Sequence, residues 1–501
     1  MSKAQKFSIE ATRESDFPRW YKETVVKSEI LDYHDINGCY VLRPNGFFIW
    51  SMIKQYFTEK IESMGVKEAY FPMLVSKAAL EKEKEHLDDF APEVAWITEC
   101  GGKPLENPVA IRPTSETIMY PYYSKWIQSY RDLPLKLNQW CNVLRWETTQ
   151  TMPFVRGREF LWQEGHTAHL TRKEADKEVF EVLDLYADVY RELLAVPVVK
   201  GTKSKKETFA GADFTTTVEV FIPSTGKGIQ AATSHSLGTN FSNMFNVTVE
   251  DPSAPGSFMP VFQNSWGLST RSIGVAILVH SDNRGVVLPP KVASVQVVIV
   301  PCGLSKNTSD EEKQNILAEA ERIEKTLKSH GIRAQADLAL NVTPGHKFNH
   351  WEVRGVPLRI EIGPKDMKNN QACFAWRMDK TKKSVSLVNI AESVKEELES
   401  IHETMYQNAK LLQDSCILKG STMDDLNTAL RSGKMCTMVW CGAVECEEKI
   451  KKITEERDKN NVVTATGAKS LCIPFTENKP TGACSVCTNE ATCIGLFGRS
   501  Y

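Results

Sequence analysis

The stretch from Asn142 to His166, NVLRWETTQTMPFVRGREFLWQEGH, constrains the fold more than any other part of this sequence. Near its end, Trp162, Glu164 and His166 occupy alternate positions, and alternate residues of a strand share one face. Glu and His beside Trp are unusual on a core face. They are typical of a ligand pocket, which has apolar walls and a few placed polar groups. The pattern therefore predicts a strand with one face lining a pocket.

A second strand is predicted just upstream, from Cys141 to Trp146, and residues typical of turns lie between Thr148 and Gly157. The simplest arrangement is two antiparallel strands joined by a long loop, with Arg145, Arg156 and Arg158 near it. Guanidinium groups that face a pocket are typical of phosphate or carboxylate binding. The alternative is a solvated, salt-bridged hairpin, since charged loops are common.

The composition is that of a globular cytosolic protein. The 501 residues suffice for roughly three domains, and a formal net charge of −2 argues against a basic nucleic-acid coat. The first twenty residues have no apolar signal core, and the longest apolar runs, such as Val292–Pro301, are too short to span a bilayer. We therefore expect a cytoplasmic location and no membrane partner.

Helical spacing recurs in the first 288 residues. Apolar residues three or four apart from Trp50 to Met64 predict a helix that Gly65 ends. The segment VKEAYFPML then predicts a strand stopped by Pro72. A second helix is expected after a capping box formed by Thr171 and Glu174. We interpret the charged run from Lys203 to Lys206 as a solvated loop.

The pattern changes after Leu288-Pro289-Pro290, which predicts a domain boundary. A strand–helix–strand–helix–strand order follows, which is typical of an α/β domain with some parallel pairing. From about Lys395, a long charged helix leads into a cysteine-rich tail. We predict domains at 1–288, 289–398 and 399–501.

Two further stretches place polar side chains among small or apolar residues. In RPTSETIMYP, Thr114 and Glu116 share strand parity and could grip an ammonium group, although a helix N-cap also explains them. In IQAATSHSLGTNF, small residues let a ligand approach the backbone. Three side chains there offer polar contacts: Gln230, Thr233 and His235.

The stretch QNSWGLSTRSIGVAILVH joins a glycine and small hydroxyl residues to an apolar run that is either a helix or a strand. Arg271 at its glycine-rich start could meet a phosphate. The competing explanation is a salt bridge at a buried helix end.

The tail holds seven of the 13 cysteines, between Cys436 and Cys493. In a reducing compartment, such clustering favours metal binding over disulfides. Four thiolates in two knuckles can supply a closed tetrahedral zinc site, and the alternative is a set of buried apolar cysteines. The predicted ligands are Cys441, Cys446, Cys484 and Cys487, with Cys436, Cys472 and Cys493 as substitutes.

Taken in order, these stretches closely resemble the prolyl-tRNA synthetases of the archaeal and eukaryotic type, over nearly the whole chain. The resemblance rests on GCYVLRPNGFFIW, FAPEVAWIT, IRPTSETIMYPYY, LPLKLNQWCNVLRWE, REFLWQEGH, TSHSLGTNF, NSWGLSTRSIG, GHKFNHWEVRGVPLRIEIGP, GAKSLCIPF and the terminal FGRSY. It implies an α/β (α+β) fold: a class II catalytic domain with an antiparallel sheet, an α/β anticodon-binding domain, and a small C-terminal zinc-binding domain.

The resemblance also implies a reaction, its partners and its cofactors. Proline and ATP would form prolyl-adenylate and pyrophosphate, and proline would then pass to the 3′ end of tRNA(Pro). Mg²⁺ would accompany ATP, and zinc would be structural. The helix around Trp50 and the strand ending at Pro72 resemble motif 1, which implies a homodimer. One departure concerns zinc, because relatives can carry C-x-C where this chain has Cys484-x2-Cys487.

Residue roles follow from the same resemblance. Arg145 and Arg271 would be the catalytic residues at the α-phosphate. The ATP site would also include Glu147, Arg156, Gln230, Thr233 and Ser269. The proline site would comprise Thr114, Glu116, Trp162, Glu164, His166, Thr233 and His235. Lys347, Glu352, Arg359 and Glu361 are candidates for reading the anticodon, with ordinary surface charge as the alternative.

Two other functions remain to be distinguished. A threonyl-type class II enzyme would place zinc in its amino-acid pocket, whereas here the cysteines gather in the tail. A non-catalytic relative would usually lack the phosphate-binding arginines, but Arg145, Arg156 and Arg271 are present.

Overall fold

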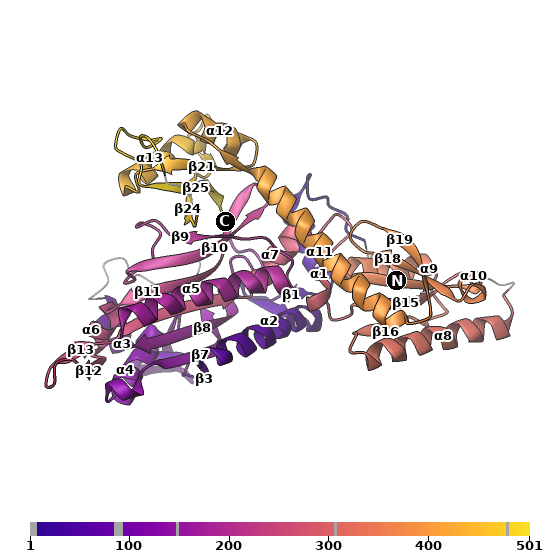
Figure 1. The fold of residues 1–501 in the computed structure, drawn as a ribbon, viewed down its shortest axis with the longest axis horizontal. Coiled ribbons are helices and arrows are strands. Elements are labelled where there is room, and N and C mark those ends of the chain that lie inside the picture. The colour runs from indigo at the N-terminus through magenta and orange to yellow at the C-terminus, as the bar shows by residue number, and fades with distance from the viewer. Residues whose placement is uncertain (1–7, 85–93, 147–149, 305–307, 477–479) are drawn as a thin grey trace.

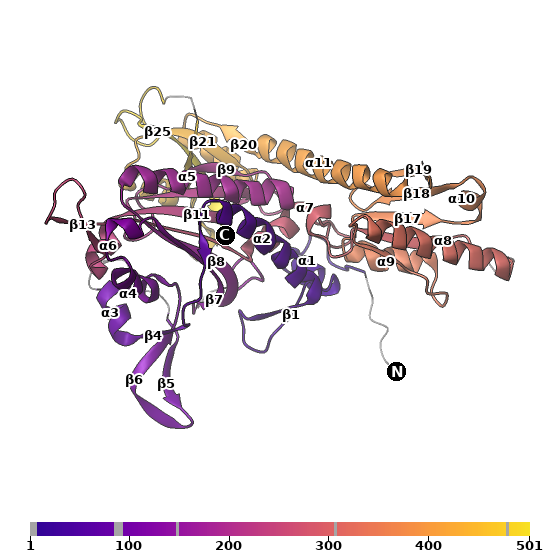
Figure 2. The same ribbon diagram turned by 60° about the horizontal axis from the view of Figure 1, so that its bottom comes forward.

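The computed structural model of the chain describes residues 8–84, 94–146, 150–304, 308–476 and 480–501. Figure 1 shows the N-terminal part around a large sheet, an α/β unit beside it, and the tail lying over the first part. Helix α11 (Ile390–Cys416) runs from the α/β unit to the tail, as Figures 1 and 2 both show. The mixed helix-and-strand class is as predicted.

One sheet joins the first and the last parts of the chain. Within the described residues it has eleven strands in the order β20-β21-β25-β24-β9-β10-β11-β14-β8-β7-β3. The strands from β9 to β7 pair antiparallel. The eleven are β3 (Lys67–Glu68), β7 (Leu135–Leu144), β8 (Glu159–His169), β9 (Val199–Thr202), β10 (Phe214–Ile222), β11 (Lys227–Gly238), β14 (Phe262–Ser269), β20 (Ile417–Lys419), β21 (Met435–Trp440), β24 (Lys469–Pro474) and β25 (Cys493–Ser500).

The predicted hairpin is present as β7 and β8, which pair from Leu135 opposite Ala168 to Leu144 opposite Glu159. The first strand is longer at its start than predicted and ends at Leu144. Arg145 therefore lies just beyond the strand, although its backbone N–H still donates to the carbonyl of Arg158 at 2.8 Å.

Helices cover this sheet, and Figure 1 shows α2 (Pro44–Ser63) and α5 (Arg172–Asp188) crossing the same side of it. Both helices were predicted. Gly65 follows α2 with a φ of +80°, and Thr171 caps α5 through the predicted capping box. The apolar sides of α2 and α5 share one core with those of α1 (Phe17–Lys27) and α7 (Arg271–His280).

The strand predicted in VKEAYFPML is present and ends before Pro72, but it is shorter than predicted. Only Lys67–Glu68 joins the large sheet, and the chain resumes as β4 (Leu74–Ser76) in a separate sheet. Pro72 lies between them and has no N–H for a ladder. That second sheet also contains β5 (Trp96–Cys100) and β6 (Lys103–Ile111), which project from the body in Figure 2.

Residues after the proline-rich boundary form the expected α/β unit. Its five strands have the order β16-β15-β17-β18-β19, and β15 pairs parallel with both β16 and β17. The elements are β15 (Val297–Pro301), α8 (Asp310–Ser329), β16 (Ala334–Ala336), α9 (Pro344–Val353), β17 (Leu358–Ile362), α10 (Pro364–Lys368), β18 (Gln371–Trp376) and β19 (Lys382–Ser386).

The tail folds back onto the large sheet. Strand β24 pairs with β9, and β25 runs parallel to the start of β11. The backbone N–H of Tyr501 donates to the carbonyl of Gly228 at 3.2 Å. The chain terminus therefore lies beside the strand that carries Gln230.

The remaining described α-helices and β-strands complete these parts of the structure. They are β1 (Leu31–Tyr33), β2 (Tyr40–Leu42), α3 (Lys77–Lys84), α4 (Glu116–Trp126), α6 (Asn240–Phe245), β12 (Thr248–Glu250), β13 (Phe258–Pro260), α12 (Met423–Arg431), α13 (Val444–Thr454), β22 (Glu456–Arg457) and β23 (Val463–Ala465). Among the helices described, none combines the length and the apolar character needed to cross a bilayer.

Candidate active site

Two adjoining cavities open at the centre of the large sheet, with volumes of about 290 Å³ and about 350 Å³. Both are lined by Arg145, Phe160, Ser269 and Arg271, so these four side chains mark their common boundary. The first cavity brings together predicted residues from well-separated parts of the sequence: Thr114, Glu116, Arg145, Trp162, Glu164, His166, Gln230, Thr233, His235, Ser269 and Arg271.

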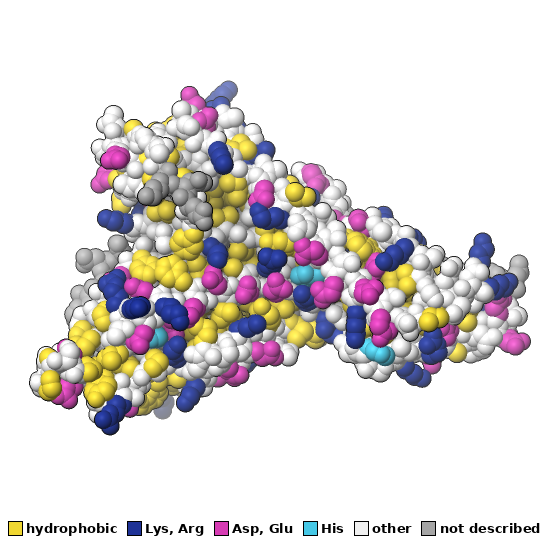
Figure 3. Space-filling view, viewed as in Figure 1, with side chains coloured by type: hydrophobic (Ala, Val, Ile, Leu, Met, Phe, Trp, Pro, Cys, Tyr) yellow, Lys and Arg dark blue, Asp and Glu magenta, His cyan; other side chains and the backbone are white. Residues whose placement is uncertain are grey.

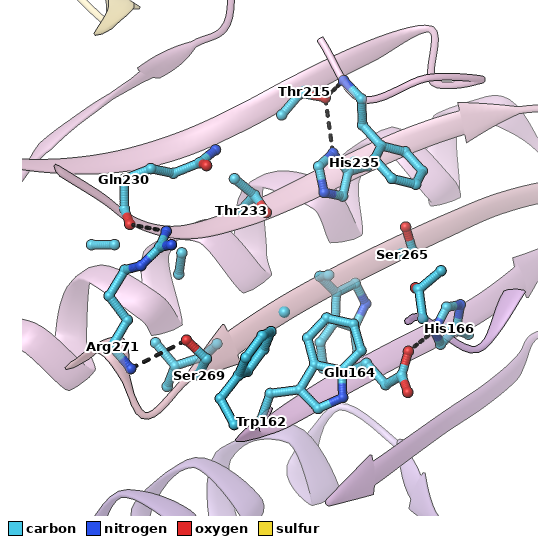
Figure 4. A pocket seen from close by; sticks show the side chains of 18 of the residues that line it. Trp162, Glu164, His166, Thr215, Gln230, Thr233, His235, Ser265, Ser269 and Arg271 are labelled. Atoms are coloured by element: carbon cyan, nitrogen blue, oxygen red, sulfur yellow. Dashed lines mark hydrogen bonds and ion pairs between the residues drawn. The ribbon is translucent and has the colours of Figure 1, made fainter. Parts of the chain in front are cut away.

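The predicted alternation along β8 is confirmed, since Trp162, Glu164 and His166 all line the first cavity. Figure 4 shows them on one side, with Gln230 and Thr233 across from them and Arg271 at the other end. On the opposite side of β8, Gly165 packs against Trp266, where an added Cβ would lie 2.2 Å from the indole ring.

Glu164 and His166 form a buried pair, with 3.0 Å between Oε2 and Nε2. Burial alone would raise the pKa of the Glu164 carboxyl, but hydrogen bonds from His166, Ser115 and Gln139 outweigh it and hold the pKa below its ordinary value. Burial alone would lower the pKa of His166, but Glu164 and Glu116 outweigh it and raise the pKa. This end of the cavity therefore favours an ionised carboxylate beside a protonated imidazole.

Thr114 and Glu116 do not share a strand face. The chain turns into α4 at Glu116, with Ser115 in the N-cap position. The hydroxyl of Ser115 donates instead to Glu164 at 2.5 Å, and the Thr114 hydroxyl donates to the Glu116 carboxylate. The buried carboxylate of Glu116 is thus placed at the cavity by the start of a helix, and not by a strand as the sequence pattern predicted.

His235 closes the same end from β11. Its Nδ1 lies 2.8 Å from the hydroxyl of Thr215, and its ring lies 4.8 Å from the ring of Phe209. Burial, together with the charge of His166, lowers the pKa of His235 to about 3. His235 is therefore neutral near pH 7 and can act as a polar wall.

The opposite end is cationic. Arg271 begins α7, and its guanidinium donates to the carbonyls of Val155 and Gln230 at 3.1 Å each. Burial lowers the pKa of Arg271, and the charges of Arg145 and Arg156 lower it further. Guanidinium groups that repel one another across a cavity would be stabilised by a bound anion.

The remaining predicted ATP contacts divide between the cavity and the loop. Arg156 is exposed and lines the second cavity. The hydroxyl of Ser269 accepts from the backbone N–H of Arg271 at 3.2 Å. Glu147 lies outside the described residues.

Sequence reasoning missed several lining residues. Phe160 has the same parity as Trp162 along β8, so the alternation could have identified it. Glu207 and Phe209 also line the first cavity, but they come from a loop with no pattern that marks them. The interpretation of Lys203–Lys206 as a solvated loop is wrong for Lys203, which is buried and donates to Glu219 at 2.7 Å.

The four predicted zinc ligands come together in the tail. The sulfur atoms of Cys441, Cys446, Cys484 and Cys487 all lie within 4.8 Å of one another. The sulfur of Cys441 lies 3.7 Å from that of Cys446 and 3.8 Å from that of Cys487. Tetrahedral zinc with bonds of about 2.3 Å requires sulfur separations of about 3.8 Å, so the donor set fits this metal.

The four residues predicted to read the anticodon divide into two pairs. Glu352 and Arg359 line a cavity of about 220 Å³ between α9, β17 and β18, together with Phe348 and Trp351. Arg359 stacks over the ring of Phe348 at 3.9 Å.

The described residues that line this cavity include neither Lys347 nor Glu361. Lys347 is buried and donates to the carbonyl of Asp337 at 2.5 Å. Glu361 lies 2.7 Å from Arg359 in an ion pair on the same strand.

Three family models match the chain. Residues 98–280 match the tRNA synthetase class II core domain (G, H, P, S and T). Residues 296–397 match the anticodon binding domain. Residues 423–501 match the prolyl-tRNA synthetase C-terminal domain.

Three of the similar proteins come from three different organisms. The proline–tRNA ligase of Encephalitozoon cuniculi is 53% identical over 99% of both chains. The cytoplasmic proline–tRNA ligase of Arabidopsis thaliana is 48% identical over 98% of this chain and 91% of its own length. The proline–tRNA ligase of Cenarchaeum symbiosum is 44% identical over 99% of this chain and 100% of its own. With the geometry above, these matches establish that the chain belongs to the prolyl-tRNA synthetase family of class II aminoacyl-tRNA synthetases.

Proposed function

We propose that the chain activates L-proline with ATP at the two adjoining cavities and then transfers proline to tRNA(Pro). One observation carries this proposal: guanidinium groups from separate segments meet at the boundary of a cavity whose far end holds buried carboxylates. A nucleotide in the second cavity would place its α-phosphate between Arg145 and Arg271. An amino acid in the first cavity would place its ammonium group near Glu116.

The chemistry requires no protein nucleophile. The carboxylate of proline attacks the α-phosphorus of ATP, a phosphorus–oxygen bond forms, and pyrophosphate leaves. Negative charge spreads over the phosphate oxygens in the transition state, so positioned cations provide the main stabilisation. Arg145 and Arg271 supply these cations, and the exposed Arg156 approaches the γ-phosphate. Mg²⁺ bound to the phosphates would neutralise further charge.

The amino-acid end suits a secondary ammonium group with a compact ring. Glu116 accepts from the ammonium nitrogen, with Thr114 as the second acceptor. Trp162 provides the apolar wall of the pocket, and the Glu164–His166 pair forms its floor. Thr233 and His235 close the pocket. Phe160, at the boundary with the second cavity, offers an aromatic surface for the adenine ring. Nucleic-acid bases stack on aromatic side chains in many other binding sites.

We infer that the tail cysteines hold a structural zinc ion. The ligands would be Cys441, Cys446, Cys484 and Cys487, whose spacing fits a closed tetrahedral site. Such an ion would cross-link the segment before α13 and the first turn of that helix to the loop before β25.

The α/β unit would bind the anticodon loop of tRNA. RNA loops are recognised through unstacked bases that stack on aromatic or guanidinium planes. The cavity with Phe348, Trp351 and Arg359 offers those surfaces, and Glu352 supplies an acceptor. Lys347 and Glu361 would act by holding neighbouring groups.

A homodimer would form through α2 and the segment after it. A groove of about 730 Å³ runs between α2 and β7 and is lined by Phe47, Trp50 and Trp140. The side chains of Phe47 and Tyr70 are 51% and 73% exposed. Hydrophobic side chains also gather over the end that carries α3 and α4 (Figure 3). Exposed apolar patches of this kind mark association surfaces.

Domain limits at 1–288, 289–398 and 399–501 are supported by the three family matches, each of which falls inside one range. A cytoplasmic location is supported by the cytoplasmic relative from Arabidopsis thaliana.

Amino-acid-dependent exchange of pyrophosphate into ATP tests the function. Proline should support exchange by the purified chain, and threonine and histidine should not. Charging of tRNA(Pro) with proline should follow. Exchange that depends on threonine instead of proline would overturn the proposal.

A further inference from the structure

The loop from Lys203 to Phe209 forms part of the wall at the amino-acid end of the first cavity. Glu207 and Phe209 line that cavity. The backbone N–H of Phe209 donates at 3.0 Å to the hydroxyl of Thr215, which in turn contacts His235. The position of this loop therefore sets part of the shape of the pocket.

The same loop is held by the tail of the chain, more than 200 residues away in sequence. Lys469 on β24 forms an ion pair with Glu207, with 2.8 Å between Nζ and Oε2. Lys206 forms an ion pair with Glu448 on α13. Lys203 donates to the carbonyl of Leu471 on β24 at 2.8 Å. Figure 1 shows β24 next to β9, the strand that precedes the loop.

The tail side of these contacts is itself well fixed. Glu448 lies in α13, two residues after Cys446 of the cysteine cluster. Its neighbour Glu447 is buried and accepts from the backbone N–H of Ser470 on β24 at 3.3 Å. Strand β24 pairs with β25 on its other side. The two anchors of the loop are thus joined to each other within the tail.

We propose that Lys206 and Lys469 are positioning residues for the amino-acid site: their ion pairs with Glu448 and Glu207 hold the loop so that Glu207 and Phe209 close the pocket. Neither lysine is among the residues that line the cavity, so any effect on the amino acid must pass through the loop. The inference rests on the proposed function, because it assigns proline to this cavity.

The two ion pairs are partly exposed. The side chains of Lys206 and Lys469 are 29% and 36% exposed, and pairs of this kind make modest contributions. Loss of both should loosen the loop without unfolding the sheet. We expect about a three- to tenfold weaker binding of proline when both pairs are removed.

The test uses the full chain and compares the double variant K206M/K469M with wild type. Lys452→Met, at an exposed lysine of α13, is the matched control. A second variant, K206E/E448K, reverses one pair and should restore it, whereas K206E alone places two carboxylates together. KM for proline and for ATP is measured by pyrophosphate exchange, and hydrogen exchange reports on residues 203–209.

The double variant should raise KM for proline by about three- to tenfold while KM for ATP and the melting temperature stay close to wild type. Residues 203–209 should exchange faster, and K206E/E448K should behave nearly as wild type. An unchanged KM for proline with unchanged hydrogen exchange would overturn the inference. Equal rises in both KM values with a lower melting temperature would also overturn it, because they indicate general destabilisation.

Failure of the proposed function gives a different result. Wild-type protein would then show no proline-dependent exchange at all. Amide hydrogen exchange of the loop needs no substrate. Faster hydrogen exchange of residues 203–209 in K206M/K469M would therefore still support the inference that the tail fixes the position of the loop. Unchanged hydrogen exchange of the loop would overturn that inference.

Discussion

At the scale of single residues, the site has guanidinium groups gathered at one end and a buried carboxylate–imidazole pair at the other. The guanidinium of Arg271 donates hydrogen bonds to two backbone carbonyl oxygens. It also lies close enough to Arg145 and Arg156 for their charges to lower the pKa of Arg271. At the other end, Glu164 and His166 balance each other inside the protein. This asymmetry orients a substrate, with its phosphate at one end and its ammonium group at the other.

Arg145→Ala should reduce proline-dependent exchange by about a hundredfold or more, because one preorganised charge at the transition state is lost. Circular dichroism and melting temperature should remain near wild type. Arg172→Ala, at an arginine that is 54% exposed on α5, serves as the control. Full exchange activity in Arg145→Ala would refute the assigned role.

Glu178 carries a pH dependence. Burial alone would raise the pKa of its carboxyl, but His169, Lys136 and Thr167 outweigh it and lower the pKa to about 2. A lowered pKa contributes stability that is present above the unfolded value of 4.5 and is lost as pH falls toward about 2. The contribution is on the order of 3 kcal/mol.

Glu178→Gln should therefore be less stable than wild type at pH 7, and the difference should shrink as pH falls from about 5 toward about 2. Urea midpoints followed at several pH values measure this. Glu181→Gln, at an exposed carboxylate of the same helix, should keep the wild-type pH profile. Parallel curves for Glu178→Gln and wild type would contradict the assignment.

At the scale of elements, the sequence predicted what local physics determines. The caps and apolar spacing of α2 and α5 are local, and so is the alternation of β8. The ends of strands were predicted less well, since Leu144 ends β7 where cross-strand pairing stops. The strand before Pro72 is shorter than predicted, and the switch to a second sheet after it was not predicted, because both sheets are defined by partners distant in sequence. Glu207 and Phe209 reached the cavity unpredicted for the same reason.

Gly165→Ala should destabilise the protein by at least about 2 kcal/mol, because the new methyl group would overlap the buried ring of Trp266. Gly267→Ala is the matched control on the neighbouring strand, where the nearest atom would lie at 3.4 Å. Thermal unfolding of both variants decides the matter. Equal melting temperatures for Gly165→Ala and wild type would show that the ring moves aside freely.

At the scale of the whole molecule, the tail is part of the sheet that bears the site. Strands β24 and β25 extend that sheet beyond β9, and the terminus reaches Gly228 on β11. No local pattern in the sequence predicts pairing between β9 and β24, since the two are more than 250 residues apart. The cysteine spacing did predict the cluster, because the ligands of a knuckle lie close in sequence.

Removal of metal should weaken this arrangement. Cys441→Ser or a strong chelator should lower the bound zinc, measured by elemental analysis, from about one ion per chain toward none. Hydrogen exchange should then increase first in α13 and in the segment before β25. Ser485→Ala, beside the cluster, should retain the metal. Full zinc content in a variant lacking two of the four cysteines would show that other groups bind it.

The most direct test of the account is a crystal structure of the chain with a non-hydrolysable analogue of prolyl-adenylate. We predict that the phosphate-like group lies within hydrogen-bonding distance of Arg145 and Arg271. The proline ring should lie between Trp162 and His166, with its nitrogen on Glu116. An analogue bound elsewhere, or bound here with both arginines turned into solvent, would contradict the account.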